Sequence, residues 1–193
     1  MRYFNRTRKT SWLLMIMLAG TLSTKSSLGL AQSAVEVANY RQAVAMYSSI
    51  TGVSDQTPEI KEFVASAAAR LPQTGSPDEL SATSTLTFVS LAGLYCNSMI
   101  NADAAQATTS LRRAHKGVNF TLTPAQLTAE VKAGVAAEYA QLFWQRTPGT
   151  NEAQELVGLM NAVSVGLLTA ADTKTVFLAA CTAAGASLAT IAH

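Results

Sequence analysis

Residues 85–100 read TLTFVSLAGLYCNSMI, the most continuously apolar run after the first 31 residues of the chain. At 3.6 residues per turn, its apolar side chains fall on two opposite sides of a helix. One side holds Leu86, Val89, Gly93, Cys96 and Ile100, and the other holds Phe88, Leu91, Tyr95 and Met99. A helix that is apolar on both sides is packed by neighbours all round, so the sequence predicts a central helix here.

The rest of the chain repeats the helical spacing. Alternating strand patterns are nearly absent, and Gly, Pro and aromatic residues are sparse, which favours an all-α fold. Further helices are predicted over about 33–49, 57–71, 102–115, 124–145, 151–167 and 173–191. Thr123 and Gln126 have the spacing of a capping box at the start of the fourth of these segments. The pattern predicts a single compact bundle of about six or seven helices after a cleaved N-terminal signal peptide.

Residues 1–31 have the pattern of a secretory signal peptide. A basic segment without acids contains Arg2, Arg6, Arg8 and Lys9, and a short apolar run, 12–19, follows it. Small residues at 29–31 predict cleavage after Ala31, with cleavage after Ser33 as the second option. An uncleaved anchor or a disordered tail is the alternative. The four basic residues suit a bacterial leader, so residues 32–193 are expected to form a periplasmic or extracellular helical domain.

Loss of this leader changes the charge of the chain. It removes five of the 14 Lys and Arg residues and none of the 12 Asp and Glu residues, which leaves nine against twelve and a formal charge of −3. The basic pI of about 8.6 therefore belongs to the leader, and nucleic-acid binding is not expected. Membrane contact is expected only through the leader before cleavage. A C-terminal membrane span over 176–192 is the rival interpretation, although this run is slightly short and rich in alanine.

The chain has two cysteines, Cys96 and Cys181, separated by 85 positions. Each lies on the apolar stripe of its predicted helix, and export exposes both to an oxidising compartment. The sequence therefore predicts a disulfide between two neighbouring helices. The alternative is a pair of buried free thiols, since a free cysteine behaves as a small apolar residue.

Motifs that carry chemistry are missing from the sequence. It contains no HExxH, CxxC or CxxCH motif and no glycine-rich phosphate loop, so neither a metal nor a cofactor is expected. The histidines are His115 and the terminal His193. A serine triad would have to use His115, and nothing resembling GxSxG accompanies it. This shortage of groups favours a non-enzymatic role.

Two charged features are nevertheless candidate sites. Arg112, Arg113 and Lys116 form a basic run that either stabilises the C-terminal end of a helix or binds a small anion. Glu138 falls in the middle of the apolar stripe of the helix over 124–145. A carboxylate in that position either pairs with an Arg or Lys side chain or has a raised pKa and acts as an acid or base.

Trp144 and Arg146 are the third candidate, as an anchor for a protein partner. Trp144 points away from the apolar stripe, so it either packs under the turn over 147–150 or is exposed for binding. The first functional hypothesis is a non-catalytic structural or protein-interaction module. The alternatives are a carrier of a small apolar ligand or lipid inside the bundle and, third, an enzyme that uses Glu138.

Overall fold

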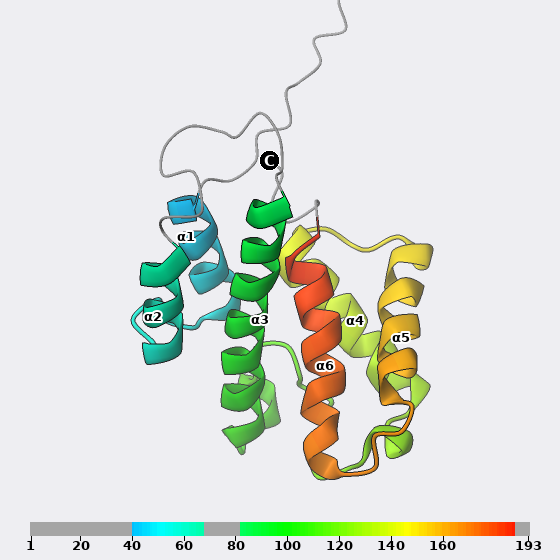
Figure 1. Ribbon diagram of the computed structural model, residues 1–193. Helices are drawn as coiled ribbons and strands as arrows, with labels where there is room; N and C mark the ends of the chain where they lie inside the picture. Colours follow the sequence, from blue (N-terminus) through cyan, green and yellow to red (C-terminus); the bar gives the residue numbers. More distant parts are fainter. Residues whose placement is uncertain (1–39, 68–81, 188–193) are drawn as a thin grey trace, which may run out of the picture. The chain divides into compact units, whose positions relative to one another are not determined.

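The computed structural model describes residues 40–67 and 82–187, all within one unit that spans Ala34–His193 (Figure 1). The predicted leader over 1–31 and its cleavage site lie outside the described residues. So do the first residues of the helix predicted over 33–49, the last residues of those predicted over 57–71 and 173–191, and the loop between the second helix and the central one.

The described chain is helical. Its α-helices are α1 (Tyr40–Thr51), α2 (Pro58–Ala67), α3 (Ala82–Ala105), α4 (Ala129–Trp144), α5 (Thr150–Ser164) and α6 (Ala170–Gly185). Two short 3-10 turns, η1 (Thr109–Leu111) and η2 (Pro124–Gln126), lie between α3 and α4. Within these ranges no residue is in a strand, and the predicted all-α bundle is confirmed. None of the described helices is long and apolar enough to cross a membrane.

Helix α3 lies between α1 and α2 on one side and α6 on the other, as predicted for a central helix (Figure 1). Its C-terminal half is buried on both sides, with Tyr95 and Cys96 fully inaccessible. Its N-terminal half is not, because Leu86 is 68% exposed and Val89 is 37% exposed. Asn97 and Asn101 in the C-terminal half are exposed as well, so α3 is central but the prediction of packing all round it is wrong.

The helix predicted over 102–115 does not form. Helix α3 continues to Ala105, and the chain then runs irregularly through η1 to the start of α4. The Asp103 carboxylate accepts hydrogen bonds from the backbone N–H groups of Arg113 (2.8 Å) and Ala114 (3.0 Å). A side-chain acceptor thus replaces the helical carbonyls for these two N–H groups, which favours a turn over a helix.

Helix α4 also begins later than predicted. The Gln126 side chain accepts a hydrogen bond of 2.9 Å from the Thr123 N–H, but this pair encloses only the 3-10 turn η2. The N-cap of α4 is Thr128, whose hydroxyl accepts a hydrogen bond from the Val131 N–H.

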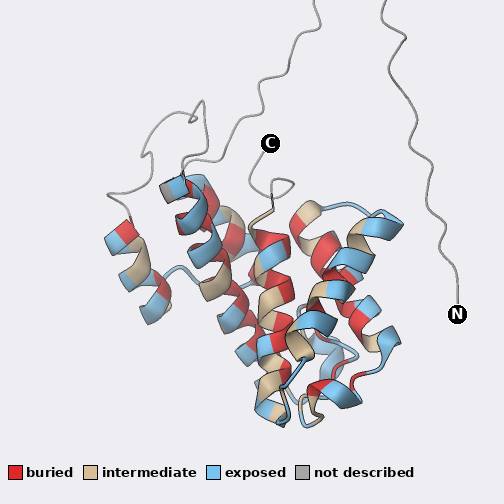
Figure 2. Cartoon of the chain, turned by 45° about the vertical axis from the view of Figure 1, so that its right-hand side comes forward, coloured by how far each residue is buried: buried red, intermediate tan, exposed pale blue. Residues whose placement is uncertain are grey.

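The core contains three tyrosines that are fully inaccessible: Tyr47, Tyr95 and Tyr139. In Figure 2 buried residues alternate with exposed ones along the helices, as expected for helices that bury one face. The Tyr47 hydroxyl donates a hydrogen bond of 2.8 Å to the Gly185 carbonyl, which joins α1 to the end of α6. Burial raises the pKa of Tyr95 to about 12, so its hydroxyl stays protonated and available as a donor.

A disulfide joins Cys96 of α3 to Cys181 of α6, and both residues are fully buried. The predicted cross-link is confirmed, as is the prediction that the two helices are neighbours. The bond connects two helices whose cysteines are separated by 85 positions in sequence. It therefore fixes the contact that the rest of the bundle surrounds.

Candidate functional site

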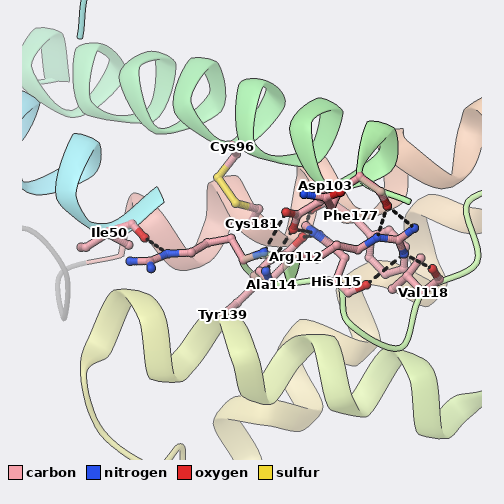
Figure 3. A network of polar contacts seen from close by, with 12 residues as sticks. Ile50, Cys96, Asp103, Arg112, Ala114, His115, Val118, Tyr139, Phe177 and Cys181 are labelled. Atoms are coloured by element: carbon pink, nitrogen blue, oxygen red, sulfur yellow. Dashed lines mark hydrogen bonds and ion pairs between the residues drawn. A yellow bond between two sulfur atoms is a disulfide. The ribbon is translucent and has the colours of Figure 1, made fainter. Parts of the chain in front are cut away.

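A buried polar network connects α3, the loop after it, α4 and α6 (Figure 3). His115 Nδ1 lies 2.7 Å from Asp103 Oδ2, and His115 Nε2 lies 2.6 Å from the Tyr139 hydroxyl oxygen. The His115 and Tyr139 side chains are fully inaccessible. The internal histidine is thus a satisfied core residue, and substrate cannot reach it in this conformation.

Two bonds of this network have a defined direction. The ionised Asp103 carboxylate can only accept, so His115 Nδ1–H donates to it. The Tyr139 hydroxyl donates to the Phe177 carbonyl oxygen, 3.2 Å away, and its oxygen also lies 2.6 Å from His115 Nε2. Burial alone would raise the pKa of Asp103, but the hydrogen bond from His115 and those from two backbone N–H groups outweigh it. The pKa of Asp103 therefore lies below its usual value, and the carboxylate stays charged.

Arg112 of the predicted anion patch is turned toward the backbone (Figure 3). Its guanidinium donates two hydrogen bonds to the Gln106 carbonyl, at 3.1 and 3.2 Å, and another to the Val118 carbonyl. The same group lies over the Phe120 ring, 5.4 Å from its centroid. Arg112 therefore holds the irregular loop closed.

Arg113 joins this loop to α1. Its Nε donates a hydrogen bond of 2.8 Å to the Ile50 carbonyl, and its Nη2 donates one of 3.1 Å to the Ser49 carbonyl. These carbonyls belong to the last turn of α1, which has no basic residue of its own. Arg113 thus stabilises the C-terminal end of a helix, as one of the two predictions for the basic run proposed. The helix is α1, because the segment that contains the run is not helical.

The structure brings two residues of the basic run together with Glu138, which the sequence did not connect. An open pocket of about 310 Å³ lies between the loop and α4. Its lining consists of Arg113, Lys116, Glu138, Gln141 and Leu142. The pocket therefore contains two cations, one carboxyl group and one amide beside an aliphatic wall.

Glu138 is half-buried, and its Oε2 atom is buried with no hydrogen-bond partner among the described residues. Burial raises the pKa of Glu138, the Lys116 charge opposes this, and the Asp103 charge adds to it. A hydrogen bond from the Lys116 backbone N–H also lowers the pKa, but the net shift is upward. Glu138 therefore has a raised pKa and lies within range of the Lys116 charge.

A second open pocket, of about 340 Å³, lies on the other side of Glu138 along α4. Its lining is mainly apolar or small and consists of Gly117, Glu130, Val131, Gly134, Val135 and Glu138. The two pockets share Glu138, so a cationic pocket and a largely apolar one meet at this carboxyl group.

Trp144 and Arg146 lie elsewhere, at the C-terminal end of α4. The Trp144 indole N–H lies 2.7 Å from the Ser187 hydroxyl and 3.2 Å from the Ala184 carbonyl, so the ring packs against the end of α6. Arg146 lies over this ring and forms an ion pair with Glu152, which lowers the pKa of Glu152 to about 2. The indole therefore has a structural role at the end of α6.

The turn between α5 and α6 is a further candidate that sequence reasoning did not single out. Val165 is 82% exposed and Leu168 is 79% exposed, the two highest values among the large apolar side chains described. Gly166 between them has φ +81°, and Leu167 packs against the core. The sequence does contain an indication of this surface: Val165 and Leu168 are aliphatic, lie close to Gly166, and belong to no apolar stripe of a predicted helix.

Across the described ranges, no three His, Cys, Asp or Glu side chains converge on a point that could hold a metal ion. The Asp103 and Tyr139 partners of His115 were missed because they come from two other segments, and nothing in their local sequence distinguishes them. In comparisons with known proteins, no family model, no curated protein and no solved structure matches this chain.

Proposed function

We propose that residues 32–193 form an exported, non-catalytic helical module that binds a partner protein through the turn between α5 and α6. The observation that carries this proposal is the exposure of Val165 and Leu168 on that turn. Export is supported by the leader pattern of residues 1–31 and by the disulfide, which is typical of oxidising compartments.

The turn holds the two exposed side chains in place. The Asp172 carboxylate accepts hydrogen bonds from the N–H groups of Leu168 (3.1 Å) and Thr169 (2.8 Å), which caps α6. The Leu167 side chain packs into the core between the two exposed residues. A preorganised turn loses little conformational entropy when a partner binds it, so more of the contact energy appears as affinity.

The chemistry of the turn suggests what the partner provides. Burying one exposed aliphatic side chain contributes roughly 1.5–3 kcal/mol, so an apolar cleft that takes both would supply a hot spot. A stable interface needs about 800 Å² on each side, so the faces of α5 and α6 next to the turn would contribute as well. The proposed partner is therefore a protein with a small apolar cleft and a polar rim.

The other functional hypotheses have less support. The enzyme hypothesis depends on Glu138 as acid or base. His115 is not a second group for it, because this side chain is bonded to Asp103 and Tyr139 in the interior. The carrier hypothesis needs an apolar cavity inside the bundle, whereas the described interior contains large, fully buried side chains: Tyr47, Tyr95, Tyr139, Phe88 and Phe177.

The test uses a photocrosslinking amino acid at position 165 in the protein exported by its own host, with position 111 as the matched control. Leu111 is 70% exposed, so it reports non-specific capture by an exposed aliphatic residue. We expect one protein to be crosslinked from position 165 and not from position 111. Its affinity for the purified domain should fall at least tenfold in the Val165→Ser/Leu168→Ser double variant and stay unchanged in Leu111→Ser.

Equal crosslinking from both positions, or unchanged affinity of the double variant, would contradict the proposal. Glu138→Gln separates binding from catalysis. If that variant folds and keeps its partner but abolishes the cellular role, a catalytic or proton-linked carboxyl group becomes the better account.

A further inference from the structure

We propose that the two pockets on either side of Glu138 form one binding site for a short aliphatic carboxylate. The carboxylate group would lie in the cationic pocket beside Lys116, and its hydrocarbon body would lie in the apolar pocket. The same chemistry is found in a small free acid and in the C-terminus of a chain that ends in an aliphatic residue. The site shares no residue with the turn between α5 and α6, so this inference is independent of the proposed partner surface.

The charge of the first pocket selects an anion. Lys116 and Arg113 line it against one acid, Glu138, so the net charge of the lining is positive even when Glu138 is ionised. The Arg113 guanidinium is held by the α1 carbonyls, whereas the Lys116 side chain is exposed on a flexible stem. Lys116 is therefore the cation best placed to adjust to a ligand.

Glu138 explains why the anion would be a carboxylate. Its Oε2 atom is buried without a hydrogen-bond partner among the described residues, so one hydrogen-bonding position of this group is unfilled. Burial disfavours the charge of Glu138 and raises its pKa, so at a given pH a larger fraction of the group is protonated than for an exposed glutamate, and the protonated form donates a hydrogen bond. A carboxylate has two oxygens, one for the Lys116 ammonium and one for the Glu138 O–H. The Gln141 amide supplies a further donor in the same pocket.

The second pocket accounts for the aliphatic body. Val131 and Val135 contribute its apolar surface, and Gly117 and Gly134 contribute no side chain. The exposed Glu130 also lines this pocket, so the positive charge is confined to the first pocket and the carboxylate group would lie there. At each of these glycines an added Cβ would meet no atom within 4 Å, so the space above them is open. At about 340 Å³ the pocket accommodates a group of a few carbon atoms, near the lower end of the usual range for ligand pockets.

The test is a titration of the exported protein with 4-methylpentanoate, monitored by backbone amide chemical shifts at pH 6.0 and pH 7.5, where the ligand is ionised. We expect saturable shifts at Lys116, Gly117 and Gln141, with tighter binding at pH 6.0 because a larger fraction of Glu138 is protonated there and donates a hydrogen bond to the ligand. Lys116→Met should weaken binding at least tenfold, since a charge-assisted hydrogen bond is lost. The matched control is Lys174→Met, because Lys174 is bonded to Asn101 and lines neither pocket.

Glu138→Gln distinguishes hydrogen bonding from charge. The glutamine amide is a neutral donor at both pH values, so this variant should bind with the same affinity at pH 6.0 and pH 7.5. Val165→Ser/Leu168→Ser should leave carboxylate binding unchanged, so that failure of this inference and failure of the proposed function are seen separately.

Three outcomes would overturn the inference: shifts that do not saturate, unchanged affinity of Lys116→Met, or tighter binding of 3-methylbutylamine than of the acid. A final pair of ligands identifies the source of the carboxylate. Acetyl-Ala-Leu with a free C-terminus should bind more tightly than 4-methylpentanoate if the natural ligand is a chain end, and less tightly if it is a free acid. Its C-terminal amide should not bind in either case.

Discussion

Two glycines in the α3–α6 contact differ in the space that remains for a methyl group. At Gly185 of α6 an added Cβ would lie 3.2 Å from Phe143 Cε1 and 3.3 Å from the Ala92 Cβ, both in the core. At Gly93 of α3 the nearest atom would be the Thr182 hydroxyl oxygen at 3.7 Å, an ordinary contact. The two positions therefore respond in opposite directions to the same substitution.

We expect Gly185→Ala to lower the free energy of unfolding by about 1–2 kcal/mol, because overpacking the core outweighs the gain in helix propensity. Gly93→Ala should raise it by roughly 0.5–1 kcal/mol, since alanine is favoured inside a helix and nothing has to move. Urea denaturation of both variants measures the difference. Stabilisation by Gly185→Ala would show that the Phe143 ring moves at little cost.

At the level of elements, the segment between α3 and η2 has almost no regular structure, and two side chains, Asp103 of α3 and Arg112 of the segment itself, hold it in place. The Asp103 carboxylate accepts two backbone N–H bonds and the His115 bond, and Arg112 bonds the carbonyls on the inner side of the loop. These two side chains thus bond several backbone groups that a helix would bond through its own carbonyls and N–H groups. Its stability is correspondingly sensitive to single substitutions.

We expect Asp103→Asn to destabilise the protein by about 2–4 kcal/mol, because a charged acceptor of several buried bonds is replaced by a neutral one. Hydrogen exchange should accelerate first at the Arg113 and Ala114 amides. Asp55→Asn, at an exposed position, is the control and should change neither quantity. Uniform loss of protection over the whole chain would contradict a local role for Asp103.

The same carboxylate makes stability depend on pH. Its pKa is lower in the folded state than its ordinary value of 3.8. The stabilisation is therefore fully present above that ordinary value and is lost as the pH falls through the lowered folded pKa. The difference in free energy of unfolding between wild type and Asp103→Asn should shrink as the pH falls below about 4, the usual pKa of an aspartate.

For the whole molecule, the disulfide is the strongest single constraint on the unfolded chain. It closes a loop across 85 positions, and the chain-entropy model assigns a loop of this size about 4–5 kcal/mol. We expect the protein reduced in denaturant to have a free energy of unfolding lower by that amount than the disulfide-bonded protein. The denatured, unreduced protein should show no thiol that reacts with a labelling reagent. Two reactive thiols would contradict the bond.

Native protein should resist reduction, because both cysteines are fully buried and a reductant cannot reach them until the bundle opens. The rate of reduction should therefore follow the rate of opening of the α3–α6 contact. Rapid reduction under native conditions would show that this contact opens locally.

The sequence by itself was sufficient for the helical class, the central position of α3 and the Cys96–Cys181 pair. Apolar spacing follows from the period of the backbone, which is a local property, and two cysteines allow one intramolecular pairing. The same local reasoning failed over 102–115, where the residues are small and no apolar stripe indicates a burial direction. There a carboxylate from the preceding helix, Asp103, decides the path of the chain.

Only the tertiary structure decided what the polar side chains do. The bonding of His115 to Tyr139, of Arg113 to the end of α1 and of Trp144 to the end of α6 joins atoms from segments far apart in sequence. The same holds for the meeting of Lys116 and Glu138 at one pocket. Hydrogen bonds and charge pairs act over a few ångströms, so their partners are set by how the helices pack, and no local pattern in the chain records that packing.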